Sequence, residues 1–320
     1  MPEPRWGLLI VLYLFLGGLS AGLFFASALA TWLQVEGKPA FPRIARIGAL
    51  LAPWPVSLGS ALLVFDLGHW YRFYKLFVTF EWHSPMSIGA WLLALFSGVT
   101  MLAFWAHLPQ EALAAALGRL PRRLRFLSFI DRPDREGFRR PLAMLGFPLA
   151  IGVGIYTGVL LGAVQARPFW NTNLVAQMFL FSALSTGCAT LILALSLGRA
   201  GLDEREAKLL ISADITLIVL ELFIVLPYVI HGALSPLAVQ QALKLVLGGP
   251  FTLAFWGLFL ALGLLLPLAL EVWELRPALS GQGKFHPGRV LAGISAALVI
   301  FGGFVLRYLF VYAGQMSSFQ

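Results

Sequence analysis

Long uncharged apolar runs alternate with short polar segments along the whole chain. Eight of these runs, counted from the sequence, are close to or above the roughly 20 residues that an α-helix needs to cross a bilayer. They comprise residues 8–33, 47–67, 88–107, 142–163, 172–197, 209–230, 251–272 and 290–312. Apolar and polar residues do not alternate within the runs as they do in barrel strands. The pattern therefore predicts an all-α integral membrane protein with eight transmembrane helices.

The composition agrees with this class. Hydrophobic residues make up 59% of the chain and charged residues 12%, whereas soluble domains are about 45–50% apolar and about 25% charged. The net charge of +8 lies mainly between the apolar runs, which disfavours nucleic-acid binding as its explanation. Ala28-Leu29-Ala30 resembles a signal-peptidase site, but residues 6–35 are uncharged. That run is much longer than a signal peptide's apolar region of about 7–15 residues, so we expect a retained helix.

Lysines and arginines are distributed unevenly between the two sides that these helices define. Seventeen of the 23 lie in the first, third, fifth and seventh loops, and residues 119–140 alone hold eight arginines and no lysine. Because basic loops stay on the cytoplasmic side, both termini are predicted to be periplasmic. Trp82 and Trp170 then fall near the outer interface, where tryptophan is enriched.

Two short segments recur at the same offset of 165 residues. LSAG at 19–22 matches LSTG at 184–187, and SPMSIGAW at 84–91 matches GPFTLAFW at 249–256. The first and fifth spans run in the same direction, so this offset predicts a parallel duplication. We expect two four-helix bundles, an N-terminal half of residues 1–165 and a C-terminal half of residues 166–320. The same offset makes His231 equivalent to Asp66.

Ionisable side chains inside the apolar runs are candidate functional groups, because each costs about 2.5–3.5 kcal/mol to insert. Asp66 and Arg307 lie near the outer ends of the second and eighth spans, where a structural ion pair between them is one explanation. Asp214 and Glu221 lie seven residues apart on one face of the sixth span. Neither has a Lys or Arg within a helical turn. Each is expected to be protonated or to have a partner on another helix.

Further polar and aromatic residues gather on the outer side. His69 and His83 follow the second span, and Tyr13 and Tyr156 fall in the outer halves of the first and fourth. These residues are candidates for a site at the outer face. The alternative is that the histidines are ordinary interfacial residues and the tyrosines are packing aromatics.

No resident redox centre or metal site is predicted. The five histidines lie at span ends or in loops, so no pair stands at mid-depth to hold a haem. Cys188 is the only cysteine, which excludes a disulfide within the chain and a thiolate-ligated iron–sulfur cluster. There is also no P-loop, no dinucleotide fingerprint and no metal-ligand cluster. Redox chemistry in this protein would need a diffusible carrier.

Several motifs spread over nearly the whole sequence point to one family. They are YLFLGGLSAG at 13–22, LVFDLGHW at 63–70, SPMSIGAW at 84–91, YTGVLLGAVQARPFWN at 156–171, the carboxylate Glu221, and RYLFVYAGQ at 307–315. They resemble the NrfD/PsrC family, the membrane subunits of polysulfide reductase and related quinone-linked oxidoreductases. The resemblance implies eight spans in two four-helix bundles, both termini outside, no haem, and a quinone site near the outer face.

The resemblance also implies a function in a bacterial or archaeal cytoplasmic membrane. The protein would oxidise or reduce exchangeable menaquinone or ubiquinone and would not be a complete enzyme alone. Electrons would pass to or from a ferredoxin-like iron–sulfur subunit with several clusters and a catalytic subunit, often molybdopterin-dependent. By matching position, Asp66 and Tyr156 would hydrogen-bond the quinone or its proton acceptor. Tyr13 stands where some relatives have a histidine; tyrosine can donate to a carbonyl but is a poor base near neutral pH.

These residues suggest a mechanism. Tyr13 and Tyr156 would fix the quinone ring, Asp66 would take a proton, and His69 or His83 would pass it to the outer water.

Two further groups of residues complete the hypothesis. Asp214 and Glu221 would form a proton path from the cytoplasmic side toward the midplane. Arg167, Trp170 and Asn171, between the fourth and fifth spans, would lie where the iron–sulfur partner docks. A secondary transporter and a purely structural anchor of a redox complex are the alternatives.

Overall fold

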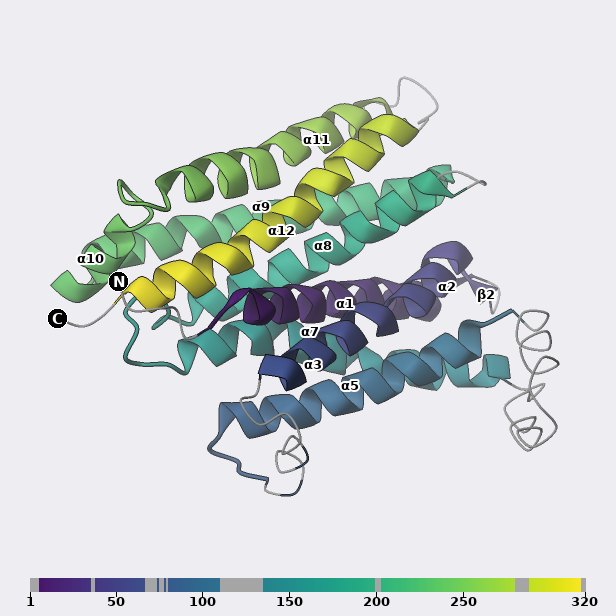
Figure 1. Ribbon diagram of the computed structural model, residues 1–320. Helices are drawn as coiled ribbons and strands as arrows, with labels where there is room; N and C mark the ends of the chain where they lie inside the picture. Colours follow the sequence, from purple (N-terminus) through teal and green to yellow (C-terminus); the bar gives the residue numbers. More distant parts are fainter. Residues whose placement is uncertain are drawn as a thin grey trace.

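The computed structural model describes residues 6–35, 38–66, 74, 78, 80–109, 135–198, 203–279 and 288–317. Within them the chain is almost entirely helical, and eight helical segments are long and apolar enough to cross a membrane, as predicted (Figure 1). The elements are α1 (Leu8–Trp32), β1 (Gln34–Val35), β2 (Lys38–Pro39), α2 (Pro42–Leu51), α3 (Pro53–Asp66), α5 (Pro85–His107), η3 (Arg135–Phe138), α7 (Arg139–Gly162), α8 (Leu174–Leu197), α9 (Glu204–Leu234), α10 (Leu237–Lys244), η4 (Leu253–Leu265), α11 (Leu266–Leu279) and α12 (Arg289–Met316). The two short strands pair antiparallel.

Proline decides where several helices begin or break. Pro42 and Pro85 stand in the first turns of α2 and α5, where the missing N–H costs no hydrogen bond. The second span divides into α2 and α3 at Pro53. Pro148 and Pro227 stay inside the continuous helices α7 and α9, as membrane helices with supporting neighbours allow.

The helices form two groups that follow the order of the chain. The first group contains α1, α2, α3, α5 and α7, and the second contains α8, α9, η4, α11 and α12 (Figure 1). The groups meet because α1 packs on α8 and α12 as well as on its own neighbours, and α7 also packs on α8. Consistent with this central position, α1, α8 and α12 are the most buried of the spans.

Glycines let the central helices α1 and α8 approach closely. A methyl group on Gly22 would lie 2.9 Å from the Cα atom of Gly187, and one on Gly18 would lie 3.2 Å from the Cβ atom of Ala183. Such contacts require small residues on both helices. Gly22 and Gly187, like Gly18 and Ala183, are separated by the same 165 positions as the recurring segments. Positions matched by the repeat therefore contact each other where the two groups meet.

The two ends of the described chain lie at the same end of the molecule (Figure 1). The Trp6 amide donates to Gln315 Oε1 at 2.8 Å, and Gln315 Nε2 donates to the Trp6 carbonyl at 3.0 Å. These bonds join the segment before α1 to the last turn of α12. They fix the two ends on one side of the bundle, as a protein with eight spans requires.

Candidate functional site

Two tyrosines from different helices meet inside the first helix group. Tyr13 on α1 and Tyr156 on α7 are both buried, and their hydroxyl groups lie against each other. The Tyr156 ring covers Gly89 in the second turn of α5 so closely that a methyl group at Gly89 would overlap it. Within the described part of the chain, the Tyr13 hydroxyl makes no hydrogen bond of good geometry. A buried hydroxyl group whose hydrogen-bonding capacity is not satisfied within the protein can donate to a carbonyl oxygen of a ligand.

Asp66 lies further toward one end of the same helix group. It is the last residue of α3, and its side chain is exposed. Two turns earlier, a methyl group on Gly59 would lie 3.4 Å from the Tyr13 carbonyl oxygen. At a rise of about 1.5 Å per residue, Asp66 is about 10 Å along α3 from that contact. His83 is exposed just before α5, and His69 lies outside the described residues.

Arg307 on α12 is fully buried where α1, α8 and α12 meet. Its Nη1 donates to Ser182 Oγ at 2.5 Å and to the Gly303 carbonyl at 2.9 Å, and its Nη2 donates to the Phe179 carbonyl at 3.1 Å. Ser182 also hydrogen-bonds the carboxyl of Glu221 on α9, which interacts electrostatically with the guanidinium. Ser182 therefore links a buried cation to a buried acid.

The suggested ion pair between Asp66 and Arg307 is not formed. Asp66 is exposed at the end of α3, whereas the partners of Arg307 lie on α8, α9 and α12. Of the two alternatives for Glu221, protonation or a partner on another helix, the structure provides the second, because both Ser182 and Arg307 belong to other helices.

Asp214 is likewise buried, two turns before Glu221 on α9. Its Oδ1 accepts a hydrogen bond from Ser185 Oγ at 2.5 Å, and its carboxyl also meets that of Glu271 on α11. Glu271 Oε1 in turn accepts a bond from Ser295 Oγ on α12 at 2.9 Å. Four helices of the second group therefore contribute to one polar cluster in an otherwise apolar interior.

The loop between α7 and α8 contains the residues predicted to dock a partner. Trp170 is only 2% exposed, and its Nε1 donates to the Phe310 carbonyl at 2.6 Å. Arg167 donates two bonds of 2.6 Å to carbonyls at the end of α12. Asn171 is exposed. Arg167 and Trp170 thus hold the loop against α12, while Asn171 presents a side chain that a partner could contact.

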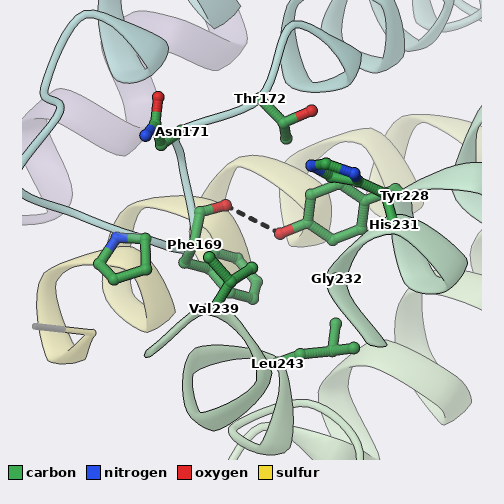
Figure 2. Close-up of a pocket in the computed structure, with 9 residues that line it drawn as sticks. Phe169, Asn171, Thr172, Tyr228, His231, Gly232, Val239 and Leu243 are labelled. Atoms are coloured by element: carbon green, nitrogen blue, oxygen red, sulfur yellow. Dashed lines mark hydrogen bonds between the residues drawn. The ribbon is translucent and has the colours of Figure 1, made fainter. Parts of the chain in front are cut away.

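A shallow pocket lies beside this loop in the second helix group (Figure 2). It is bounded by the loop, by Tyr228 and His231 on α9, and by Leu243 on α10. The Tyr228 hydroxyl donates to the Phe169 carbonyl at 2.9 Å, which Figure 2 draws as a dashed line. The residues predicted to bind a quinone do not line this pocket, so the tyrosine pair and the pocket are separate features.

Sequence reasoning missed several members of the buried polar clusters. Glu271 lies inside the predicted span 251–272, and the cost of inserting a charge could have identified it. No such signal identifies the serines Ser182, Ser185 and Ser295. Serine is common in membrane helices, and its role can be recognised only from the residues that it contacts in the structure. In the described residues, no group of three or more His, Cys, Asp and Glu is arranged to hold a metal ion.

The sequence can be compared with those of known proteins. A family model described as polysulphide reductase, NrfD, matches residues 2–318. The chain belongs to the NrfD family. It is 32% identical over 317 residues to the protein NrfD of Escherichia coli, an alignment that spans 98% of this sequence and 95% of that protein. The family resemblance drawn from the motifs is therefore confirmed.

Other NrfD-family relatives are named as parts of reductases. A component of the polysulfide reductase of Wolinella succinogenes is 33% identical over 321 residues, with 97% of this sequence and 94% of that protein aligned. A component of the selenate reductase of Mesobacillus selenatarsenatis is 27% identical over 340 residues, with 98% and 74% aligned. The protein is thus a multi-pass membrane protein of a family whose members are subunits of reductase complexes.

Proposed function

We propose that this NrfD-family protein is the quinone-reactive subunit of a respiratory oxidoreductase complex. It would exchange electrons between menaquinone or ubiquinone near the periplasmic face and an iron–sulfur subunit, which in turn serves a catalytic, molybdopterin-dependent subunit. The observation that carries the proposal is the buried Tyr13 hydroxyl, which faces Tyr156 and lacks a hydrogen bond of good geometry in the described residues. A quinone carbonyl is an acceptor that fits this donor.

The residues near the tyrosine pair have distinct roles in the proposal. A bound quinol would supply two electrons and two protons. Tyr13 and Tyr156, whose hydroxyl groups lie together, donate to one carbonyl oxygen and set the orientation of the ring, while Gly89 leaves room for the Tyr156 ring. Asp66, exposed at the end of α3, accepts the two protons one after the other and passes each toward the outer water. His69 and His83 are the proposed carriers for that last transfer.

The sidedness of the proposal follows from the loops and the termini. Basic loops favour the cytoplasmic side, and the hydrogen-bonded ends near Trp6 and Gln315 then belong to the periplasmic side. The loop with Arg167, Trp170 and Asn171 lies at this same end and is the proposed docking surface for the iron–sulfur subunit. In this surface, Arg167 and Trp170 set the shape of the loop, and Asn171 makes the direct contact.

The buried acids of the second helix group support proton transfer as an additional function. Asp214 and Glu221 lie on one face of α9, and Ser182 connects Glu221 to Arg307. We propose that this series carries protons from the cytoplasmic side toward the midplane. The contacts Gly22–Gly187 and Gly18–Ala183 also support a parallel duplication, because a twofold axis between two repeats brings matched positions together.

Quinone content of the purified complex tests the proposal. The complex should contain extractable quinone and iron–sulfur absorbance, and Tyr156→Phe should lower the quinone content. Tyr308→Phe, a partly exposed tyrosine on α12, is the matched control and should keep it. A complex that turns over quinol with no loss of affinity in both Tyr13→Phe and Tyr156→Phe would refute the site.

A further inference from the structure

Asp214 and Glu271 are two carboxyl groups in contact inside the second helix group. They belong to different helices, α9 and α11, and their side chains meet with exposed fractions of 0% and 1%. The motifs of the sequence and the quinone site leave Glu271 without a role. Two carboxylates in such contact cannot both be ionised, because the repulsion of like charges adds to the cost of burial.

Each carboxyl group of the pair accepts a hydrogen bond from one serine. Asp214 Oδ1 accepts from Ser185 at 2.5 Å, and Glu271 Oε1 accepts from Ser295 at 2.9 Å. The other oxygen atoms, Asp214 Oδ2 and Glu271 Oε2, are buried and have no donor within the described residues. Each acid therefore has one serine donor and one unsatisfied oxygen. A single proton held between the carboxyl groups would satisfy both.

Among the described residues, the charged and titratable neighbours of the pair are acids and a thiol. Cys188 faces it from α8, Glu221 from the same helix as Asp214, and Glu274 from the same helix as Glu271. Ser295 is the neighbour from α12. Arg307 is directed to Ser182 and Glu221 instead. A proton, rather than a cationic side chain, is thus the group that reduces the charge of the pair.

We propose that Asp214 and Glu271 act as one acid that binds a single exchangeable proton, with a total charge of about −1. Ser185 and Ser295 are positioning residues, each of which holds one oxygen of one carboxyl group of the pair. This site rests on the proposed function and deepens it, since it names the group that stores a proton within the proton path of the second helix group.

Glu274 indicates from which end the proton arrives. It lies three residues beyond Glu271 on α11, and its Oε1 accepts from the Gly288 amide, just before α12, at 2.8 Å. Its Oε2 has no partner within the described residues. Gly288 ends the seventh loop, which the distribution of basic residues places on the cytoplasmic side. Glu274 therefore lies on α11 between the pair and the end assigned to the cytoplasm, which is the side from which the proposed pair would take up its proton.

Amide variants can replace the shared proton without changing the charge. In Glu271→Gln, an amide N–H takes the place of the proton while Asp214 stays ionised, and Asp214→Asn does the same with the roles reversed. Both variants keep the size and the serine contacts of the pair. Because either one suffices, a failure of one variant to fold leaves the other as the test.

Infrared spectroscopy of the purified complex near neutral pH provides the measurement. The wild-type-minus-variant spectrum should show the loss of one protonated-carboxyl band in Glu271→Gln and in Asp214→Asn. The double variant should lose no more than either single variant, and Glu274→Gln should keep the band of the pair. If the band intensity lost in the double variant equals the sum of the intensities lost in the two single variants, the two acids are independent and the proposal is overturned. So would persistence of the band in both single variants.

A functional readout separates this inference from the quinone assignment. In proteoliposomes, Glu271→Gln should lower the number of protons moved per electron while quinol oxidation and bound quinone remain. Unchanged proton movement would remove the pair from the path. Absence of quinol oxidation in the wild-type complex would instead refute the proposed function, and the infrared result would still stand.

Discussion

Arg307 donates a 2.5 Å hydrogen bond to Ser182, and the same serine contacts Glu221, so one hydroxyl joins the buried cation of α12 to the buried acid of α9. Arg307 also donates to two backbone carbonyls and lies over the Phe179 ring, with the guanidinium carbon 5.0 Å from the ring centre. The arginine is thus part of the packed centre, although the sequence places it close to the C-terminal end of its span.

Removal of this cation should destabilise the protein strongly. Arg307→Met leaves Glu221 buried without its compensating charge, a change that costs about 3–5 kcal/mol. Adding Glu221→Gln should restore part of the loss, because the uncompensated acid is then absent. Thermal unfolding of the purified complex, followed for the two single variants and the double variant, measures the effect. Strictly additive losses would contradict the coupling.

Substitution of Asp66 should stop proton acceptance at the proposed quinone site. Asp66→Asn keeps the size of the side chain but cannot take up a proton, so quinol oxidation should fall by about 100-fold or more. The complex should assemble normally, since the side chain is exposed. Glu81→Gln, another exposed acid before α5, is the matched control. Wild-type turnover in Asp66→Asn would remove the residue from the mechanism.

Gly89 should control the position of Tyr156. A methyl group at Gly89 overlaps the Tyr156 ring, so Gly89→Ala should displace the ring, raise the KM for quinol and lower the quinone content. Gly98→Ala on the same helix meets no atom within 4 Å and should leave both quantities unchanged. Steady-state kinetics of the two variants provide the comparison. Equal behaviour of Gly89→Ala and Gly98→Ala would show that Tyr156 does not bind the ring.

The buried acid Glu221 should matter for proton movement and less for quinol chemistry. Glu221→Gln removes an exchangeable proton from the series that leads to Ser182 and Arg307. Proteoliposomes should therefore show a lower proton-to-electron ratio, with quinol oxidation retained. Glu204 is exposed at the start of the same helix, and Glu204→Gln is the control. An unaltered ratio in Glu221→Gln would exclude the residue from the path.

The contact between α1 and α8 should be intolerant of added volume. Gly22→Ala inserts a methyl group among the backbone atoms of Ala183 and Gly187, and overpacking of this kind costs about 1–3 kcal/mol. Gly17→Ala on the same helix has its nearest neighbour at 4.0 Å and should be tolerated. The amount of folded protein and its Tm report the difference. Equal stability of the two variants would contradict the close packing.

The spans were predictable from the sequence because length and apolarity alone decide whether a helix can cross a bilayer. The partners of the buried acids were not, because they depend on contacts between distant segments. Asp214 and Glu271 are 57 residues apart, and nothing local in either helix indicates that their side chains meet. The position of the Trp170 side chain was likewise not predictable from the sequence. Its place between two spans predicted an interfacial side chain, whereas its hydrogen bond to Phe310 turns it inward.

The glycine contact at the centre also limits how the two halves can move. Where the backbones of Gly22 and Gly187 touch, no layer of side chains is present that could shear or roll during a cycle. Alternating-access carriers work by rocking one repeat against the other. Direct backbone packing between the two halves favours a rigid protein, in which the proposed transfer of electrons and protons requires no movement of one half against the other.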